Sequence, residues 1–258
     1  MSGPKPSVLQ RELHSLASAI TFLTRIPLPG FQYDQQSQGR AILYFPLVGL
    51  LVALPAIAMY YFALTLWSQS VAVVLAMATT ILLTGGFHED GLADSADGLG
   101  GGWQRADKLR IMKDSRLGTY GALALVMSLL LKFTLLSSLP HELVPAALLT
   151  AHIVGRWSTL PLLYSTPYLG GSEASGTALL QDQQQTRLWL ATGFSFGAIL
   201  LLQSESFWLL LTVVAILLFL WRRHCLRQLG GINGDTLGAA NQMVELSIYL
   251  CLAATLAP

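Results

Sequence analysis

The sequence predicts an all-α, polytopic integral membrane protein: a helical bundle of about seven transmembrane helices with one further helix at the membrane surface. Apolar residues make up 53% of the 258 residues and charged residues only 11%, whereas soluble domains contain about 25% charged residues. The apolar residues also gather into runs close to the roughly 20 residues that a helix needs to cross a bilayer. We therefore expect one membrane-embedded domain over residues 1–258.

The first expected element is an amphipathic helix over residues 8–28, because this stretch mixes charged and apolar residues and ends among prolines. Such a helix lies in the membrane interface rather than across the bilayer. Residues 1–7 contain two prolines and are expected to form a disordered tail. Seven apolar runs follow, and the fifth and sixth are short. The expected spans are residues 41–66, 71–88, 119–138, 143–163, 188–203, 207–221 and 237–257.

The distribution of Lys and Arg predicts the orientation of these helices, since basic residues favour the cytoplasmic side. With the N-terminus inside, 14 of the 15 basic residues fall in the N-terminal segment, the inner loops or the adjoining helix ends. The outer connections hold none, and the exception, Lys132, falls within the third span. This asymmetry predicts a cytoplasmic N-terminus, and it places the chemistry on the cytoplasmic side.

The overall charge and the cysteines exclude two other kinds of function. The net charge is +1, which gives no reason to expect nucleic-acid binding. Cys225 and Cys251 show no spacing typical of a metal site or a disulfide framework. We expect both cysteines to act as small apolar side chains. The expected partner of the chain is the lipid bilayer, not a nucleic acid.

Three aspartates form the most informative pattern: Asp90, Asp94 and Asp97, just after the second apolar run. At about 100° per residue on a helix, they fall within an arc of roughly 60°. Like charges this close resist ionising together unless a cation neutralises them. Carboxylate oxygens suit Mg²⁺, Ca²⁺ or Mn²⁺, and Mg²⁺ often shares its shell with substrate phosphates. We therefore predict a metal and catalytic site here, against the alternative of a charged helix end among lipid headgroups.

The basic stretch that follows supplies candidate phosphate ligands. Lys113 and Arg116 precede the third span, where an arginine can fork onto a phosphate near the metal. The alternative is binding of lipid headgroups, which we favour for Lys108 and Arg110. Asp114 is a further candidate catalytic residue, and either Asp97 or Asp114 is expected to accept a substrate proton. The glycines before this stretch fit either a close approach to phosphate or a flexible helix end.

A second polar cluster stands before the last span. Asn233 and Asp235 lie in a glycine-rich segment, and Glu245 follows inside the apolar run. An ionisable residue at membrane depth is a candidate functional residue, so we predict that Asn233, Asp235 and Glu245 complete a metal shell or orient a nucleophile. Asn233 and Asp235 are also candidates to bind substrate. The alternative is a helix N-cap formed by Asp235. Arg156, at the inner end of the fourth span, is predicted to bind a phosphate or to reach the membrane surface as an anchor.

Three long motifs combine these candidates, and a fourth precedes them. They are Phe22-Leu23-Thr24-Arg25-Ile26-Pro27, Gly85-Gly86-Phe87-His88-x-Asp90-Gly91-Leu92-Ala93-Asp94-x-x-Asp97-Gly98, Met112-x-Asp114-Ser115-Arg116-Leu117-Gly118-Thr119 and Gly234-Asp235-Thr236-Leu237-Gly238-Ala239-Ala240. Taken together and in this order, the motifs closely resemble the cobalamin (5′-phosphate) synthase family, also called adenosylcobinamide-GDP ribazoletransferases. The resemblance runs through most of the chain.

The resemblance implies a Mg²⁺-dependent transferase of the bacterial cytoplasmic (inner) membrane, with its active site facing the cytoplasm. Such an enzyme joins adenosylcobinamide-GDP to α-ribazole or α-ribazole 5′-phosphate. The products are adenosylcobalamin (5′-phosphate) and GMP, which makes this the nucleotide-loop assembly step of cobalamin biosynthesis. The implied partners are these two substrates and the lipid bilayer. A homo-oligomer or a complex with other corrinoid-pathway enzymes is left open as a further partner.

The resemblance carries over most directly to Asp90, Asp94 and Asp97, as an acidic motif associated with metal and catalysis. It extends to Asp114, Arg116, Asn233 and Asp235. The aspartate spacing is also similar to that of CDP-alcohol phosphotransferases, which are the first alternative, although their full signature is not met. An ion or proton-coupled transporter is the second alternative, because carboxylates within a bundle can form an ion path.

Overall fold

The computed structural model describes residues 7–31, 35–170 and 184–255. These residues form helices joined by turns and short loops, which confirms the all-α prediction. Within these ranges the only isolated extended pairing is a parallel bridge between Tyr168 and Ile232. Residues 1–6 of the expected N-terminal tail lie outside the described residues, so that part of the prediction is untested.

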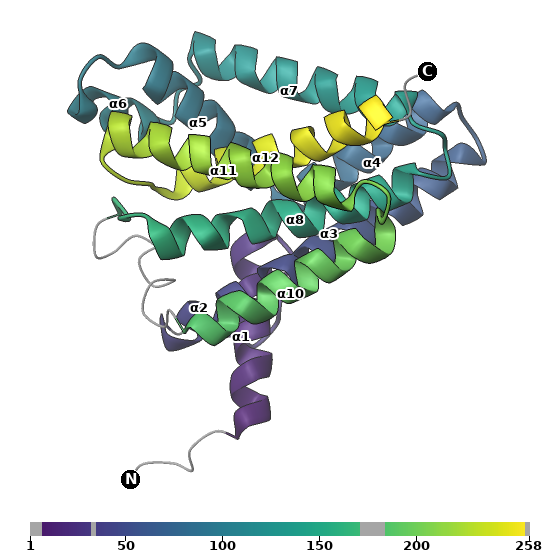
Figure 1. Cartoon of the computed structure of the whole chain (residues 1–258), viewed down its shortest axis with the longest axis horizontal. Coiled ribbons are helices and arrows are strands. Elements are labelled where there is room, and N and C mark those ends of the chain that lie inside the picture. The colour runs from purple at the N-terminus through teal and green to yellow at the C-terminus, as the bar shows by residue number, and fades with distance from the viewer. Residues whose placement is uncertain (1–6, 32–34, 171–183, 256–258) are drawn as a thin grey trace.

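The last helix, α12 (Gly234–Thr255), lies within the bundle rather than at its edge. It packs against α5 (Phe87–Gly101), α7 (Thr119–Ser138), α8 (Val144–Ser165) and α11 (Phe207–Leu229), and the arrangement can be followed in Figure 1. Buried positions make up 72% of its most apolar 18 residues. Polar side chains along α12 therefore meet other helices more often than lipid.

A second group of helices packs around α8. Helix α3 (Phe45–Leu64) contacts both α8 and α4 (Gln69–Thr84), and α10 (Gln185–Leu202) contacts α8. The N-terminal helix α1 (Val8–Leu23) extends away from the bundle at its first turns (Figure 1). It begins where the amphipathic helix was expected and ends at Leu23. The remaining short helices are α2 (Gln35–Ala41), the 3-10 helix Ile42–Tyr44 and α6 (Arg105–Met112).

Four helical stretches of the described chain are long and apolar enough to cross a membrane. They are Gln38–Leu64, which runs from α2 into α3, and the helices α7, α11 and α12. Helices α4 and α5 qualify as a fifth if they form one broken span, bent by 86°. The prediction of a multi-pass membrane protein is therefore confirmed, but four or five candidate spans are found where about seven were expected.

The fourth and fifth expected spans, 143–163 and 188–203, form the helices α8 and α10 but are not among these candidates. Helix α8 is buried along most of its length, and His152, Arg156 and Ser158 are among its buried residues. A helix that other helices surround needs no continuous apolar surface, so its polar residues lower its hydropathy without exposing charge to lipid.

The second expected span, 71–88, breaks at a sharp turn after Thr84. Gly85 and Gly86 both adopt a left-handed conformation with φ of 70°, which glycine enters without a steric penalty. The backbone N–H of Arg25 donates to Leu83 O at 2.7 Å, and a Cβ at Gly85 would collide with the Arg25 side chain. The N-terminal segment thus supports the bend that turns α5 away from α4.

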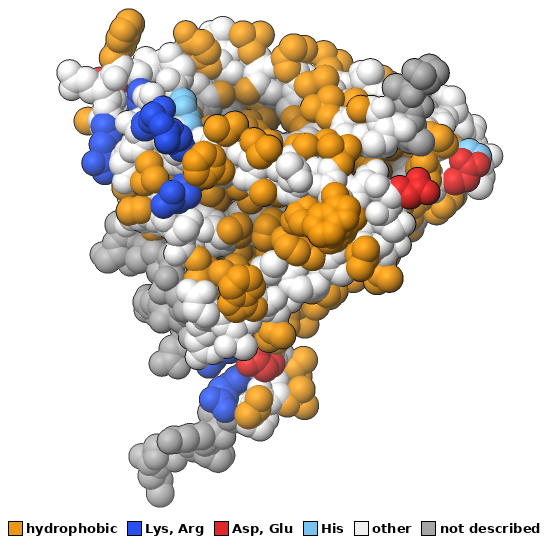
Figure 2. Space-filling model, in the orientation of Figure 1, with side chains coloured by type: hydrophobic (Ala, Val, Ile, Leu, Met, Phe, Trp, Pro, Cys, Tyr) orange, Lys and Arg blue, Asp and Glu red, His pale blue; other side chains and the backbone are white. Residues whose placement is uncertain are grey.

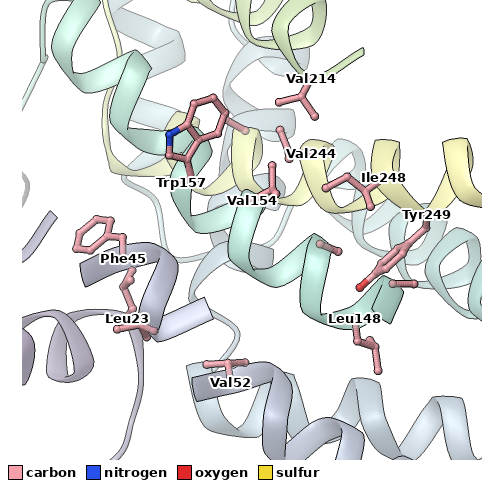
Figure 3. Packing of buried hydrophobic residues seen from close by; sticks show 14 of the residues in the cluster. Leu23, Phe45, Val52, Leu148, Val154, Trp157, Val214, Val244, Ile248 and Tyr249 are labelled. Atoms are coloured by element: carbon pink, nitrogen blue, oxygen red, sulfur yellow. The ribbon is translucent and has the colours of Figure 1, made fainter. Parts of the chain in front are cut away.

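The core consists of apolar side chains from facing helices. Figure 3 shows Val154 and Trp157 of α8 beside Val244 and Ile248 of α12, all of which belong to one buried cluster. Small residues let helix backbones approach closely in membrane proteins. Gly49 of α3 is one of them, because a Cβ at this position would collide with the backbone of α8. This packing holds α8 and α12 in a defined register beneath the polar residues described next.

Candidate functional site

The three predicted aspartates do lie on one helix, α5, but their surroundings differ. Asp90 is exposed, Asp94 is half-buried and Asp97 is buried. The helix carries no basic residue in its last turn, so it offers no local cation to its own carboxylates. The expected helical acidic face is therefore present, with a gradient of burial along it.

The buried member, Asp97, connects α5 to the start of α7. Its Oδ2 accepts the backbone N–H of Gly118 at 2.7 Å, and its Oδ1 accepts that of Gly121 at 2.8 Å. These N–H groups have no partner within α7, and a carboxylate at a helix N-terminus also favours the helix dipole. A Cβ at either glycine would clash with this carboxylate. Asp97 thus has backbone amides as its observed partners, and its role as a metal ligand stays a prediction.

The crossing of α5 and α12 brings in a fourth aspartate, Asp235. The helices meet at glycines, because a Cβ at Gly91 would lie 2.9 Å from Asp235 O and 3.1 Å from the Cα of Gly238. The carboxylate of Asp94 is repelled by those of Asp90, Asp97 and Asp235, and Asp235 is in turn repelled by Asp90. We call Asp90, Asp94 and Asp235 the acidic cluster.

Asn233 explains why Asp235 is free to face α5. Asn233 Oδ1 accepts the backbone N–H of Thr236 at 3.0 Å, and the Asn233 N–H donates to Thr236 Oγ1 at 2.9 Å. Asn233 is therefore the N-cap of α12, and the alternative that Asp235 fills this role is wrong. Asn233 Nδ2 also donates to Asp235 Oδ2 at 2.8 Å. One asparagine thus starts the helix and orients the carboxylate.

Two of the predicted phosphate ligands lie on the same side as the acidic cluster. Lys113 is exposed at the end of α6 and attracts the carboxylate of Asp235. Arg116 forks onto Asp114, with Nη2 to Oδ2 at 2.6 Å and Nε to Oδ1 at 3.0 Å. These hydrogen bonds lower the pKa of Asp114 to about 2. Such a weakly basic carboxylate suits the orientation of Arg116 better than the predicted catalytic proton transfer.

The glycines at the end of α5 serve packing between helices. A Cβ at Gly98 would lie 2.8 Å from Lys108 O, and one at Gly100 would lie 2.8 Å from the ring of Tyr120. They therefore let α6 and α7 approach α5 closely, and a contact with phosphate stays a prediction. Lys108 is buried and donates to Gln228 of α11, so its predicted surface role is wrong. Arg110, by contrast, is exposed and pairs with Asp107 at 3.4 Å.

A second group of charged residues lies inside the bundle. Lys132 Nζ donates to Glu245 Oε2 at 2.7 Å and to Gln242 Oε1 at 2.6 Å. On the other side of the same carboxylate, His152 Nδ1 lies 3.0 Å from Glu245 Oε1, and Arg156 donates to that oxygen. All five residues are buried. We call Lys132, His152, Arg156, Gln242 and Glu245 the buried ionic cluster.

The position of Arg156 corrects a prediction. Its guanidinium was expected to bind a phosphate or reach the membrane surface, yet it is 2% exposed and pairs with Glu245. The sequence did contain a signal for this cluster, since Lys132 and Glu245 interrupt apolar runs. It contained none for their pairing, because the two residues are more than a hundred positions apart.

The acidic cluster offers the donor atoms that Mg²⁺ prefers, but its carboxylates do not converge on one point. Its members present carboxylate oxygens, which are the ligands this ion prefers. Among the described residues, no three His, Cys, Asp or Glu side chains converge closely enough to enclose a metal ion. The donor chemistry is therefore present, and binding of an ion requires the carboxylates to draw together.

These features define a class of protein before any comparison is made. Carboxylates gather at one end of the central helices of a multi-pass membrane protein, next to cations that suit phosphate. This arrangement is typical of a membrane-embedded transferase that acts on phosphate-containing substrates. The chain belongs to the cobalamin-5-phosphate synthase family, whose model matches residues 15–253.

Individual relatives extend this assignment over nearly the whole chain. An adenosylcobinamide-GDP ribazoletransferase of Shewanella pealeana is 44% identical over 250 residues, which cover 94% of this chain and 96% of the relative. The protein of that name from Shewanella halifaxensis is 45% identical with the same coverage. One from Ralstonia pickettii is 40% identical over 96% of this chain and 98% of its own length. No solved structure matches the chain.

Proposed function

We propose that the protein joins adenosylcobinamide-GDP to α-ribazole or α-ribazole 5′-phosphate and releases GMP. Relatives that carry the name of this transferase match almost the full length of the chain. The observation that carries the proposal is the crossing of α5 and α12, where Asp90 and Asp94 of one family motif face Asp235 of another. Two distant motifs thus contribute to one acidic cluster.

The proposed reaction is an exchange at the diphosphate. The ribose hydroxyl of the ribazole attacks the cobinamide-side phosphorus, a new phosphodiester forms, and GMP leaves with the electrons of the broken P–O bond. The hydroxyl proton must pass to a base. Asp235 suits this role because Asn233 holds its Oδ2, which leaves Oδ1 free to accept the proton. We assign the guanylyl phosphate to Lys113 and Arg116, because both are exposed and cationic.

We propose Mg²⁺ as the cofactor, held by Asp90 and Asp94, which are one helical turn apart on α5. When bound, Mg²⁺ would neutralise charge on the diphosphate and on the leaving oxygen. The mutual repulsion of the carboxylates supports this proposal, because a cation between them removes that repulsion. Asp97 contributes by holding the start of α7, and with it the loop that carries Arg116.

We place this site on the cytoplasmic side of the bacterial inner membrane. Figure 2 supports the orientation, since Lys and Arg side chains gather at the end of the molecule where α6 and the last turns of α11 lie. Acidic side chains lie at the opposite end of this face. Basic residues are retained on the cytoplasmic side of membrane proteins.

The test uses the full-length protein purified in detergent with adenosylcobinamide-GDP, α-ribazole 5′-phosphate and Mg²⁺. We expect GMP release by the wild type, and a loss of roughly a hundredfold or more in Asp94→Asn. Asp107→Asn is the matched control, because Asp107 is a half-exposed aspartate of the neighbouring helix whose ion pair in the described structure is with the exposed Arg110. A wild type that releases no GMP would refute the function. Equal release in excess EDTA would refute the role of the metal.

A further inference from the structure

The last turns of α11 form a hollow that the proposed reaction does not use. Five residues line it: Phe219, Arg222, Arg223, Leu226 and Arg227. They recur at intervals of three and four positions, so they occupy one face of the helix. The hollow has a volume of about 430 Å³. We call it the arginine groove.

Positive charge in the arginine groove is not neutralised by the described part of the protein. None of its three arginines forms an ion pair with a described carboxylate. Arg222 is held in place, since its Nε and Nη2 donate to Ser165 O at 3.2 and 2.7 Å. Arg223 and Arg227 are exposed and make no such bond to a described residue. Within the described chain, one guanidinium is thus fixed and two are available to an anion.

The groove lies where an apolar surface meets a polar one. Helix α11 is a candidate membrane span, and Ile216, Phe219 and Leu220 expose 53%, 59% and 56% of their surface along it. The sequence then changes to Arg222-Arg223-His224. Figure 2 shows the same succession on this face, with hydrophobic side chains along the bundle and basic ones at its end. This level corresponds to the lipid headgroups.

We propose that the arginine groove binds an anionic phospholipid, with the headgroup phosphate on the arginines and the acyl chains along Phe219 and the apolar face of α11. Guanidinium groups suit this ligand because they fork onto phosphate oxygens. Basic pockets beside transmembrane helices bind such headgroups. A free phosphate or nucleotide would leave the apolar part of the surface unused. The proposal stands on this surface alone and is independent of the proposed enzymatic reaction.

The binding also has a consequence for the acidic end of the molecule. Gln228, one residue after the groove, accepts a hydrogen bond from Lys108 of α6, and a Cβ at Gly230 would lie 3.1 Å from Arg105 Nη1. Helix α6 therefore rests on the end of α11 that holds the lipid. A bound lipid stabilises this end of α11 and, through it, the position of α6.

The test is native mass spectrometry of the delipidated full-length protein in an uncharged detergent. Phosphatidylglycerol, phosphatidylcholine or glycerol 3-phosphate is added in separate arms. We expect retention of phosphatidylglycerol and little retention of the other two. In Arg223→Gln/Arg227→Gln we expect roughly thirtyfold weaker retention of phosphatidylglycerol, since each arginine near an anionic headgroup contributes a factor of about five. Arg222 is kept because it supports the end of α8.

The matched control is Arg11→Gln/Arg110→Gln, which removes two exposed arginines elsewhere and should retain the lipid. An equal loss in both double variants would overturn the proposal in favour of diffuse attraction. Equal retention of phosphatidylcholine would overturn the need for an anionic head, and equal retention of glycerol 3-phosphate would assign the groove to soluble phosphates. If the delipidated wild type forms a dimer and Arg223→Gln/Arg227→Gln is monomeric, the groove is instead an interface with a second copy of the chain. An unchanged helical content by circular dichroism verifies that each variant is folded.

Discussion

Two sets of charged residues share helix α12, and they are built on opposite principles. The acidic cluster gathers Asp90, Asp94 and Asp235, and none of these three carboxylates forms an ion pair with a described cation. The buried ionic cluster pairs Glu245 with Lys132 and Arg156 inside the bundle. Carboxylates left unbalanced at an accessible place are available to a ligand, whereas balanced charges deep in a bundle hold helices together.

The charges around the buried ionic cluster are close to balanced. Glu89 lies 3.9 Å from Lys132. The carboxylates of Glu89 and Glu245 therefore face the two cations Lys132 and Arg156 when the nearby imidazoles of His88 and His152 are neutral. The hydrogen bonding of this cluster is less complete, because Arg156 Nε is buried without a partner in the described structure, as are both amide atoms of the nearby Asn241. Buried polar groups without partners are costly.

The largest expected loss of stability comes from breaking the buried pair of Lys132 and Glu245. Lys132→Met leaves Glu245 without its lysine, and removal of one partner from a buried ion pair costs about 3–5 kcal/mol. We expect a corresponding fall in the free energy of unfolding, measured by titration with denaturing detergent. Lys132→Met/Glu89→Gln should recover part of this loss, because Glu245 keeps its pair with Arg156 and the second carboxylate beside the missing lysine is gone. A double variant less stable than the single one would contradict the pairing.

Removing a charge from the acidic cluster should not lower the free energy of unfolding, in contrast to the buried ionic cluster. Asp94→Asn removes repulsion among the carboxylates, so stability should be unchanged or raised by up to about 1 kcal/mol. The same variant should lose GMP release by roughly a hundredfold or more. Unfolding and activity are measured on the same preparation, with Asp107→Asn as the control. A fall in both stability and activity would mean that Asp94 supports the fold as Glu245 does.

Asp97 shares the α5 face of the acidic cluster but is buried and hydrogen-bonded like Glu245. The substitution Asp97→Asn tests whether it supports the fold or binds a metal ion. In Asp97→Asn the amide group would face one of the backbone N–H groups that the carboxylate accepts. We expect a loss of about 1–3 kcal/mol in stability, which is typical of a buried donor left without an acceptor. The comparison with Asp94→Asn is made in the same unfolding assay. Unchanged stability with lost Mg²⁺-dependent activity would instead make Asp97 a metal ligand.

The smallest expected effect concerns the surface pair of Asp114 and Arg116. The pKa of Asp114 is lowered from 3.8 to about 2 by its hydrogen bonds to Arg116. Because the lowered pKa belongs to the folded state, the pair contributes above about pH 4 and is lost as the pH falls toward 2. In Arg116→Gln we expect the midpoint of Asp114, followed by carbon-13 NMR of labelled aspartate, to return toward 3.8. A midpoint that does not move would show that the pair does not persist in solution.

Local features of the chain could be predicted because they depend on neighbouring residues. Apolar runs place most helices, and helical periodicity places Asp90 and Asp94 on one face. Four or five helices of the described chain meet the length and hydropathy criteria for a span where about seven were expected, because buried polar residues lower the hydropathy of a helix that packs among other helices. Helix α8 is such a case, since most of its residues are buried although it carries His152 and Arg156.

The tertiary structure decided which residues meet. The sequence alone determined that α5 carries an acidic face and that polar residues precede α12. It could not determine that Gly91 and Gly238 let these helices cross so closely that Asp235 joins the acidic cluster while Asp97 turns toward α7. Nor could it pair Lys132 with Glu245. Periodicity describes one helix at a time, whereas the partner of a charged side chain depends on packing between helices that are distant in the chain.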